Sequence, residues 1–160
     1  MKSILDPCCG SRMFYFDKRN PNVLFCDIRE NVDEILCDGR KLIVDPDLVM
    51  DVTKLDFPDN TFSLVIFDPP HLKAGSGWQV KKYGKLPKDW KTFLSKSFNE
   101  CWRVLKPNGT LIFKWNEFSI PLKEVLNCFS QAPIAGNKRP KSSMTHCLIY
   151  FKGGEESCQN

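Results

Sequence analysis

The stretch SLVIFDPPHLK, from Ser63 to Lys73, places an acid, two prolines and a histidine directly after an apolar run. Asp68 supplies a negative charge and hydrogen-bond acceptors. Pro69 and Pro70 have no N–H group, so the turn offers carbonyl acceptors without competing donors. Such a turn can bind a ligand that donates hydrogen bonds, although Asp and Pro also commonly end a strand without any further role.

Three more acids, Asp6, Asp27 and Asp51, also follow apolar runs directly. Asp27 lies 17 residues after Gly10, which is close to the spacing of the acid that binds ribose hydroxyls in nucleotide-binding sheets. A single acid after a strand is commonly a cap. Because the carboxyl ends of parallel strands share one edge of a sheet, four such acids indicate a ligand site.

The elements that must position these acids alternate along the chain. The clearest helix begins after Asp89, which can cap it, and ends before Pro107-Asn108-Gly109. Its apolar residues recur at spacings of three and four: Trp90, Phe93, Leu94, Phe98, Cys101 and Leu105. A second helix is predicted at about residues 121–129, and a short one at 31–36 before a turn at Asp38-Gly39. Apolar β-type runs cover residues 3–5, 23–26, 48–50, 64–67, 111–115 and 147–151.

This alternation predicts an α/β fold of one domain, with a doubly wound, mostly parallel sheet covered by helices on both faces. The last run could add an antiparallel edge strand. We assign residues 1–152 to the domain and 153–160 to a polar C-terminal tail.

Composition is that of a globular protein of 160 residues. The start of the chain has too short an apolar stretch for a signal peptide, and no apolar run is long enough to span a membrane, so we expect a cytoplasmic protein without membrane contact. Eight cysteines are present, but no CxxC pair, and Cys26, Cys101 and Cys147 lie in apolar segments. We therefore expect reduced thiols and no metal site.

Charge is distributed unevenly. Residues 1–70 carry 8 Lys and Arg against 13 Asp and Glu, whereas residues 71–160 carry 15 against 6. Six lysines and one acid lie between His71 and Thr92, and a second basic cluster, NKRPK, spans Asn137 to Lys141. One basic run is commonly a solvated face, but two in the same half of the chain favour a polyanionic partner.

The chain resembles the Rossmann-like S-adenosylmethionine-dependent methyltransferases, and among them the adenine-specific amino-methyltransferases of DNA. ILDPCCGS resembles their first motif, LDFPDNTFSLVIFDPPH their acidic turn and fourth motif, and ECWRVLKPNGTLIFKW the helix and fifth strand that follow. The likeness covers about residues 3–115, in the expected order. In its short length the chain is similar to compact, stand-alone members of phage type.

Three departures from the family pattern are evident. Arg12 stands where the family has the last glycine of its first motif, and could contact the methionine carboxylate of the cofactor or be an exposed side chain. The usual helix before the first strand has no room. A separate target-recognition domain is lacking, so a protein partner could supply that recognition.

The resemblance implies catalytic roles for Asp68, Pro69, Pro70 and His71. The Asp68 carboxylate and the Pro69 carbonyl would accept hydrogen bonds from the target amine, and the carboxylate would stabilise positive charge that develops on nitrogen. His71 stands where the family has an aromatic residue that stacks on the target base. No metal is needed, because the sulfonium is already an activated methyl donor.

The resemblance also implies the cofactor site. Close approach of the backbone at Cys8 to Gly10 requires small side chains. Asp27 would bind the ribose hydroxyls, Ile28 would lie beside the adenine ring, and Asp51 would accept from the adenine amine. The complete set implied to contact S-adenosylmethionine is Asp6, Pro7, Cys8, Cys9, Gly10, Asp27, Ile28, Asp51 and Asp68.

The loop at 72–88 combines glycines, aromatic residues and lysines, as a lid over a nucleic-acid strand would require. The substrate residues predicted in and beside it are Lys73, Trp78, Lys81, Lys82, Tyr83 and Lys85. The target base would have to be single-stranded or flipped out of a duplex.

Three functions remain open from the sequence. The first is methylation of adenine in DNA. The second is the same chemistry on RNA, on a cytosine amine or on a protein side-chain amide, because the turn recognises a planar amine rather than its carrier. The third is a cofactor-binding subunit without catalysis, although such a subunit would be expected to lack the acid of the fourth motif. DNA is favoured over RNA as the partner.

Overall fold

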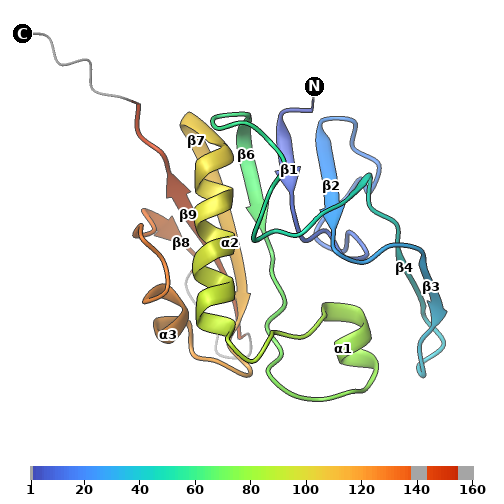
Figure 1. The fold of residues 1–160 in the computed structure, drawn as a ribbon. Helices are drawn as coiled ribbons and strands as arrows, with labels where there is room; N and C mark the ends of the chain where they lie inside the picture. Colours follow the sequence, from blue (N-terminus) through green and yellow to red (C-terminus); the bar gives the residue numbers. More distant parts are fainter. Residues whose placement is uncertain (1, 138–143, 155–160) are drawn as a thin grey trace, which may run out of the picture.

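The computed structural model describes residues 2–137 and 144–154. In this part of the chain seven strands form one sheet, and two more form a separate hairpin (Figure 1). The sheet strands are β1 (Ile4–Asp6), β2 (Val23–Asp27), β5 (Leu48–Val49), β6 (Phe62–Phe67), β7 (Leu105–Asn116), β8 (Ala135–Gly136) and β9 (Thr145–Phe151).

The sheet has the order β5-β2-β1-β6-β7-β9-β8. The first five strands in this order are parallel, and β9 runs antiparallel to β7. The predicted α/β fold with a mostly parallel sheet is thus confirmed. The predicted antiparallel C-terminal strand is also found as β9. It is not the edge strand, because the two-residue strand β8 pairs with its outer side.

Helix α2 (Trp90–Val104) matches the predicted helix, and the Asp89 side chain accepts a hydrogen bond from the Thr92 N–H at 3.3 Å, as a cap does. Its apolar face, with Leu94, Phe98 and Cys101 fully buried, packs against β6 and β7. The shorter helix α3 (Leu122–Leu126) leads to Phe129, which stacks on Phe98 at 4.2 Å between ring centroids. Both helices therefore cover the same face of the sheet.

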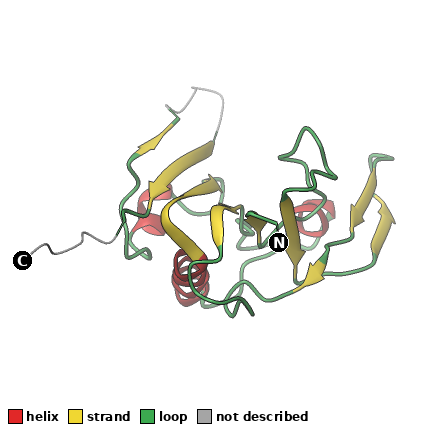
Figure 2. Ribbon diagram, turned by 90° about the horizontal axis from the view of Figure 1, so that it is seen from above, coloured by secondary structure: helices red, strands yellow, loops and turns green. Residues whose placement is uncertain are grey.

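The predicted short helix at 31–36 is wrong. These residues belong to a hairpin of β3 (Val32–Ile35) and β4 (Lys41–Val44), joined by the predicted turn at Asp38-Gly39. Leu42 and Val44 form a small core with Leu36, and Trp78 packs against it. Figure 2 shows the hairpin projecting from the sheet, at the end of the molecule away from α3 and β8 in Figure 1.

We expected helices over both faces of the sheet, and in the described residues they cover only one face. In the described chain the connections from β1 to β2 and from β2 to β5 contain turns and the hairpin instead of helices. On the face away from α2, Ile112 is half-buried, and Ile149 and Phe151 are 36% and 46% exposed.

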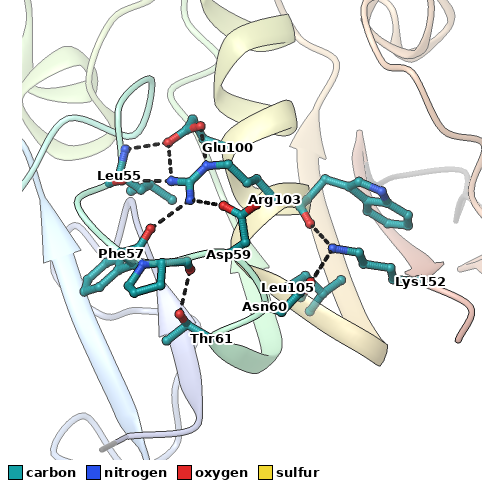
Figure 3. Close-up of polar contacts among 11 residues, drawn as sticks. Leu55, Phe57, Asp59, Asn60, Thr61, Glu100, Arg103, Leu105 and Lys152 are labelled. Atoms are coloured by element: carbon teal, nitrogen blue, oxygen red, sulfur yellow. Dashed lines mark hydrogen bonds and ion pairs between the residues drawn. The ribbon is translucent and has the colours of Figure 1, made fainter. Parts of the chain in front are cut away.

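At the edge of the sheet where β6 and β7 begin, Arg103 joins α2 to the segment before β6 (Figure 3). Its guanidinium bonds to both carboxylate oxygens of Glu100 at 2.8 Å, to Asp59 at 2.8 Å and to the carbonyls of Leu55 and Phe57. Bidentate Arg–carboxylate pairs are the most directional ion pairs in proteins, so this network orients α2 against the sheet.

Cys26 and Cys101 are fully buried in the core, as the sequence indicates. No helix in the described residues is long and apolar enough to cross a membrane. Most of the NKRPK cluster and residues 155–160 of the predicted tail lie outside the described residues.

Candidate functional site

The four acids that follow strands lie at one edge of the sheet, below which α1 (Trp78–Tyr83) and its flanking loops pass (Figure 1). Asp6 and Asp68 line a cavity of about 720 Å³, and Asp27 and Asp51 line a second of about 260 Å³. The two cavities share Asp68, with residues Cys8, Arg29 and Tyr83. The edge therefore holds one connected site of the size that small cofactors occupy.

Asp6 is 3% exposed at the end of β1. Its carboxylate accepts hydrogen bonds from the Tyr15 hydroxyl at 2.8 Å and from the Cys8 N–H at 3.1 Å. Burial, aided by the nearby charges of Asp68 and Asp27, raises the pKa of Asp6 to about 7, although the two hydrogen bonds act to lower it. A positive charge placed near Asp6 would therefore stabilise its ionised form.

The loop after β1 is built from small side chains. Cys9 N–H donates to the Cys26 carbonyl at 2.8 Å, which holds the loop against β2. Burial raises the pKa of both the Cys8 and the Cys9 thiols, so both are neutral. Gly10 has a φ of 50°, a left-handed conformation that glycine adopts most readily.

Asp27 is 4% exposed and is the partner of this loop. Its Oδ2 accepts from the Gly10 N–H at 2.8 Å. Both oxygens also contact Arg29, whose Nε lies 3.0 Å from Oδ1 and whose Nη2 lies 3.2 Å from Oδ2. A third Arg29 nitrogen donates to the Lys81 carbonyl of α1 at 2.9 Å, so Arg29 links the acid to this helix.

The smaller cavity is bordered by the other predicted cofactor residues. Ile28, 67% exposed, and Asp51 both line it, together with Pro7. Asp51 Oδ1 accepts from the N–H and the hydroxyl of Thr53, both at 2.8 Å, which orients the carboxylate.

Asp68 lies between the two cavities, where β6 ends. Its Oδ2 is 2.6 Å from Nζ of Lys114, which reaches it from the neighbouring strand β7. Burial raises the pKa of Asp68, while the charge and hydrogen bond of Lys114 oppose this. The Lys114 ammonium also lies 5.2 Å from the ring centroid of Phe14.

The two prolines and His71 continue the turn beside Tyr83 and Gly84. Pro69 is buried, and a Cβ at Gly84, which has a φ of 75°, would lie 3.2 Å from Cγ of Pro70. His71 is flanked by Tyr83, with ring centroids 5.3 Å apart. Burial lowers the pKa of His71, as does the charge of Lys114, so the imidazole is neutral at physiological pH.

The predicted substrate residues divide into two groups. Lys82 and Tyr83 border the large cavity beside His71, and Lys85 lines the smaller one. The others point elsewhere. Lys81 pairs with Glu34 of β3 at 2.6 Å, Trp78 packs into the hairpin core, and Lys73 lies 6.0 Å from the ring centroid of Trp90.

Arg12 has a φ of 56°, the conformation expected of the glycine that it replaces. Its guanidinium donates to the carbonyls of Lys18 at 2.9 Å and Asp45 at 2.6 Å, and lies 4.1 Å from the ring centroid of Phe25. The side chain is 18% exposed and joins the loop after β1 to the segment before β5.

Sequence analysis did not identify Arg29 or Lys114. A signal existed for Lys114, since it is the one charged residue in the apolar run LIFKW, at the end of the segment that resembles the family's fifth strand. Arg29 follows Asp27 by two residues, a spacing that does not by itself indicate contact.

Comparison with protein families finds none that matches the sequence, and no curated protein matches it either. Solved structures do match in fold. The PH0226 protein of Pyrococcus horikoshii aligns with 93% of this chain and 81% of its own, at 18% identity and a TM-score of 0.57.

A TehB-like SAM-dependent methyltransferase of Corynebacterium glutamicum aligns at 15% identity with a TM-score of 0.53, covering 94% of this chain and 79% of its own. A SAM-dependent methyltransferase of Leishmania major aligns at 13% identity with a TM-score of 0.51, covering 92% and 63%. The chain therefore has the fold of these methyltransferases.

Proposed function

We propose that the protein is an S-adenosylmethionine-dependent methyltransferase that methylates the exocyclic amine of adenine in DNA. The observation that carries this proposal is the position of Asp68. It begins the Asp-Pro-Pro-His turn, and it lies where the cavity lined by Asp27 and Asp51 meets the larger cavity, which is large enough for a base.

The residues at the sheet edge fit the proposed cofactor. The small side chains of the loop after β1 and the left-handed Gly10 allow close approach to the backbone. Asp6 would lie near the cationic methionine part, and Asp27 would bind ribose hydroxyls where it now binds Arg29. Ile28 and Asp51 would contact the adenine. When bound, S-adenosylmethionine supplies a methyl group activated by its sulfonium.

The turn would prepare the target nitrogen for attack. Its lone pair is conjugated with the base, and acceptors at both N–H groups draw the nitrogen towards a tetrahedral nucleophile. Asp68 and the Pro69 carbonyl would be these acceptors. When the nitrogen takes the methyl group that the cofactor supplies, the Asp68 carboxylate would stabilise the positive charge on nitrogen and could accept the proton that the nitrogen then loses.

The neutral His71 and Tyr83 would hold the base. Their rings border the large cavity and lie 5.3 Å apart by centroids, and a neutral imidazole presents a face on which a base can stack. A base inside a duplex could not reach Asp68, so the target would be flipped out or single-stranded. The preference for DNA derives from the resemblance of the DPPH motif to the DNA enzymes.

The deciding experiment offers methyl-labelled S-adenosylmethionine with DNA, RNA, free nucleotides and peptides, and identifies the methylated atom by mass spectrometry. We expect label on the adenine amine of DNA. Asp56, an exposed aspartate, provides the control variant Asp56→Ala, which should retain activity while Asp68→Ala loses it. Label on RNA or on a peptide amide alone would overturn the DNA assignment, and no transfer to any acceptor would overturn the methyltransferase assignment.

Cofactor binding can be tested separately by calorimetry with S-adenosylhomocysteine, the demethylated product. Asp27→Ala should weaken its binding by about 1 to 3 kcal/mol if the carboxylate bonds to the ribose. Asp56→Ala should bind as the wild type does. Absence of binding by the wild-type protein at millimolar concentration would contradict the proposed cofactor.

A further inference from the structure

A third cavity, of about 450 Å³, lies between the loop after β1 and the β3–β4 hairpin. Six of its lining residues are cations and one is an acid, Asp45. The cations are Arg12, Lys18, Arg19, Arg40, Lys41 and Lys82. We call this cavity the hairpin cleft. Such an excess of positive charge in a concave surface attracts anions more strongly than the same charges on a convex one.

The cations of the hairpin cleft differ in their partners. Arg12 is bound by Asp45 and Asp47, Arg40 by Asp38, and Lys41 by Asp33, so these three have anionic or carbonyl partners already. Among the described residues, the side chains of Lys18, Arg19 and Lys82 have no carboxylate partner. These three lysine and arginine side chains remain available to a ligand.

Among these cations, the position of Lys82 most strongly indicates that the cleft binds an anion. It is only 9% exposed, and its Nζ lies 4.9 Å from the ring centroid of Tyr83 and 6.0 Å from that of Trp78. The two rings fix the ammonium at the boundary of the cleft. The ammonium has no carboxylate partner among the described residues and borders both the cleft and the large cavity, so an anion in the cleft could bind it.

The hairpin cleft is continuous with the large cavity of the site. Both are lined by Gly10, Ser11, Met13 and Lys82, and the large cavity contains Asp68. A chain whose base occupies the large cavity could therefore continue into the cleft, with Lys82 at the junction. The exposed apolar side chain of Ile43 in the cleft wall would contact a sugar.

We propose that the hairpin cleft binds the phosphodiester backbone of the polynucleotide beside the target nucleotide. This inference rests on the proposed function and extends it. It assigns the binding of phosphates to Lys82 of α1 and to Lys18 and Arg19 of the loop after β1, in place of the other lysines of the 72–88 loop. Several separate cations along one cleft match a chain with repeated charges better than a single anion.

The test compares two double charge reversals in fluorescence anisotropy with a labelled single-stranded oligonucleotide. Lys18→Glu with Arg19→Glu changes the cleft. Lys106→Glu with Lys123→Glu makes the same change of net charge at positions outside all three cavities. Affinity is measured between about 50 and 200 mM salt, where the binding of phosphates produces a steep dependence.

We expect the cleft variant to bind more weakly and to lower the slope of log K against log salt by about 1.4, since each phosphate neutralised on a single strand adds about 0.7 to that slope. The control variant should keep the slope of the wild type. Equal behaviour of the two variants, with a wild-type protein that binds and methylates the oligonucleotide, would overturn the cleft assignment and leave the proposed function standing. A wild-type protein that binds no polynucleotide would overturn both.

Lys82→Met tests the junction, because methionine can still pack against the two rings and carries no charge. We expect weaker oligonucleotide binding and unchanged affinity for S-adenosylhomocysteine. The opposite pattern would assign Lys82 to the cofactor carboxylate instead. Inorganic phosphate and a mononucleotide serve as additional probes: competition by either as effectively as by an oligonucleotide of equal phosphate concentration would show a site for a single anion, contrary to the proposal.

Discussion

Charged residues at the two edges of the sheet have opposite environments. Where β6 and β7 begin, Arg103, Glu100 and Asp59 satisfy one another and nearby carbonyls (Figure 3). The Arg103 hydrogen bonds hold the pKa of Glu100 below its ordinary value, so the ionised form is the stable one. Nothing in this network requires a ligand to complete it.

Where the same strands end, burial raises the pKa values of Asp6 and Asp68, and Lys82 lies nearly buried without a carboxylate partner among the described residues. The ionised forms of Asp6 and Asp68 therefore have an energetic cost in the free protein. Since stability would favour their replacement by paired or apolar groups, their presence is best explained by binding or catalysis. The difference between the edges thus separates residues that stabilise the fold from residues that serve the site.

Asp68→Ala should have the largest effect. We expect methyl transfer to fall by at least about a hundredfold, because the interaction that this variant removes strengthens as charge develops on nitrogen. The melting temperature and the affinity for S-adenosylhomocysteine should change little. Activity of each variant is measured at saturating cofactor on the substrate identified above, beside the melting temperature.

Asp68→Asn sharpens this test. Asn keeps an acceptor but not the charge, so part of the activity should survive. If Asp68 only ended the strand, both variants would lower stability by about 1 kcal/mol, and activity would follow the folded fraction. Near wild-type transfer by Asp68→Ala would contradict the mechanism.

Arg103→Met should produce the reverse pattern. It removes bonds to two carboxylates and two carbonyls, and we expect a loss of about 1 to 3 kcal/mol of unfolding free energy, less than for a fully buried pair because Arg103 is 30% exposed. Turnover per folded molecule should be unchanged. Urea denaturation with activity measured in the same samples checks both statements, and a lowered turnover at full folding would remove the distinction between the edges.

The contrast also explains what the sequence could predict. The strand-end acids and the Asp89 cap were predictable, because each depends on residues near it in the chain. The hairpin was not. Val32, Ile35 and Leu36 have the spacing of a helix. The segment forms a strand instead because Leu42 and Val44 are buried against Leu36 and because Trp78, far along the chain, packs against them.

The same reasoning applies to the missed site residues. Lys114 is 46 residues from Asp68, and the pairing of β6 with β7 brings them together through the partners Phe67 and Phe113. A strand pattern predicts which face a residue occupies, but register between distant strands is set by packing of the whole sheet. The partner of Asp68 therefore became evident only from the fold.

Asp6 predicts a pH-dependent affinity for S-adenosylmethionine. Its pKa of about 7 means that the carboxyl is mostly protonated at pH 6 and mostly ionised at pH 8. A cationic ligand favours the ionised form, so binding below this pKa must release a proton. We expect affinity to rise about fivefold from pH 6 to 7 and about twofold more from pH 7 to 8, and then to level off.

Calorimetry across this range measures the effect, with proton release detected in buffers of different ionisation enthalpy. Asp6→Asn should bind more weakly at pH 8 and lose this component of the pH dependence. An unchanged pH profile in Asp6→Asn would place the cation away from Asp6. Glu100→Gln, at the opposite edge, serves as the control and should keep the wild-type profile.

Lys114→Met should have the smallest effect at neutral pH and a clear effect on the pH profile. Burial raises the pKa of Asp68 and Lys114 opposes this, so removal of the ammonium raises that pKa further. The proposed mechanism requires the ionised carboxylate, and the acid limb of the rate profile should therefore move to higher pH. Lys114→Arg retains the charge and should restore the wild-type profile. If Lys114 only packed against Phe14, Lys114→Met would lower stability without moving the acid limb, and Lys114→Arg would not differ from it in pH dependence.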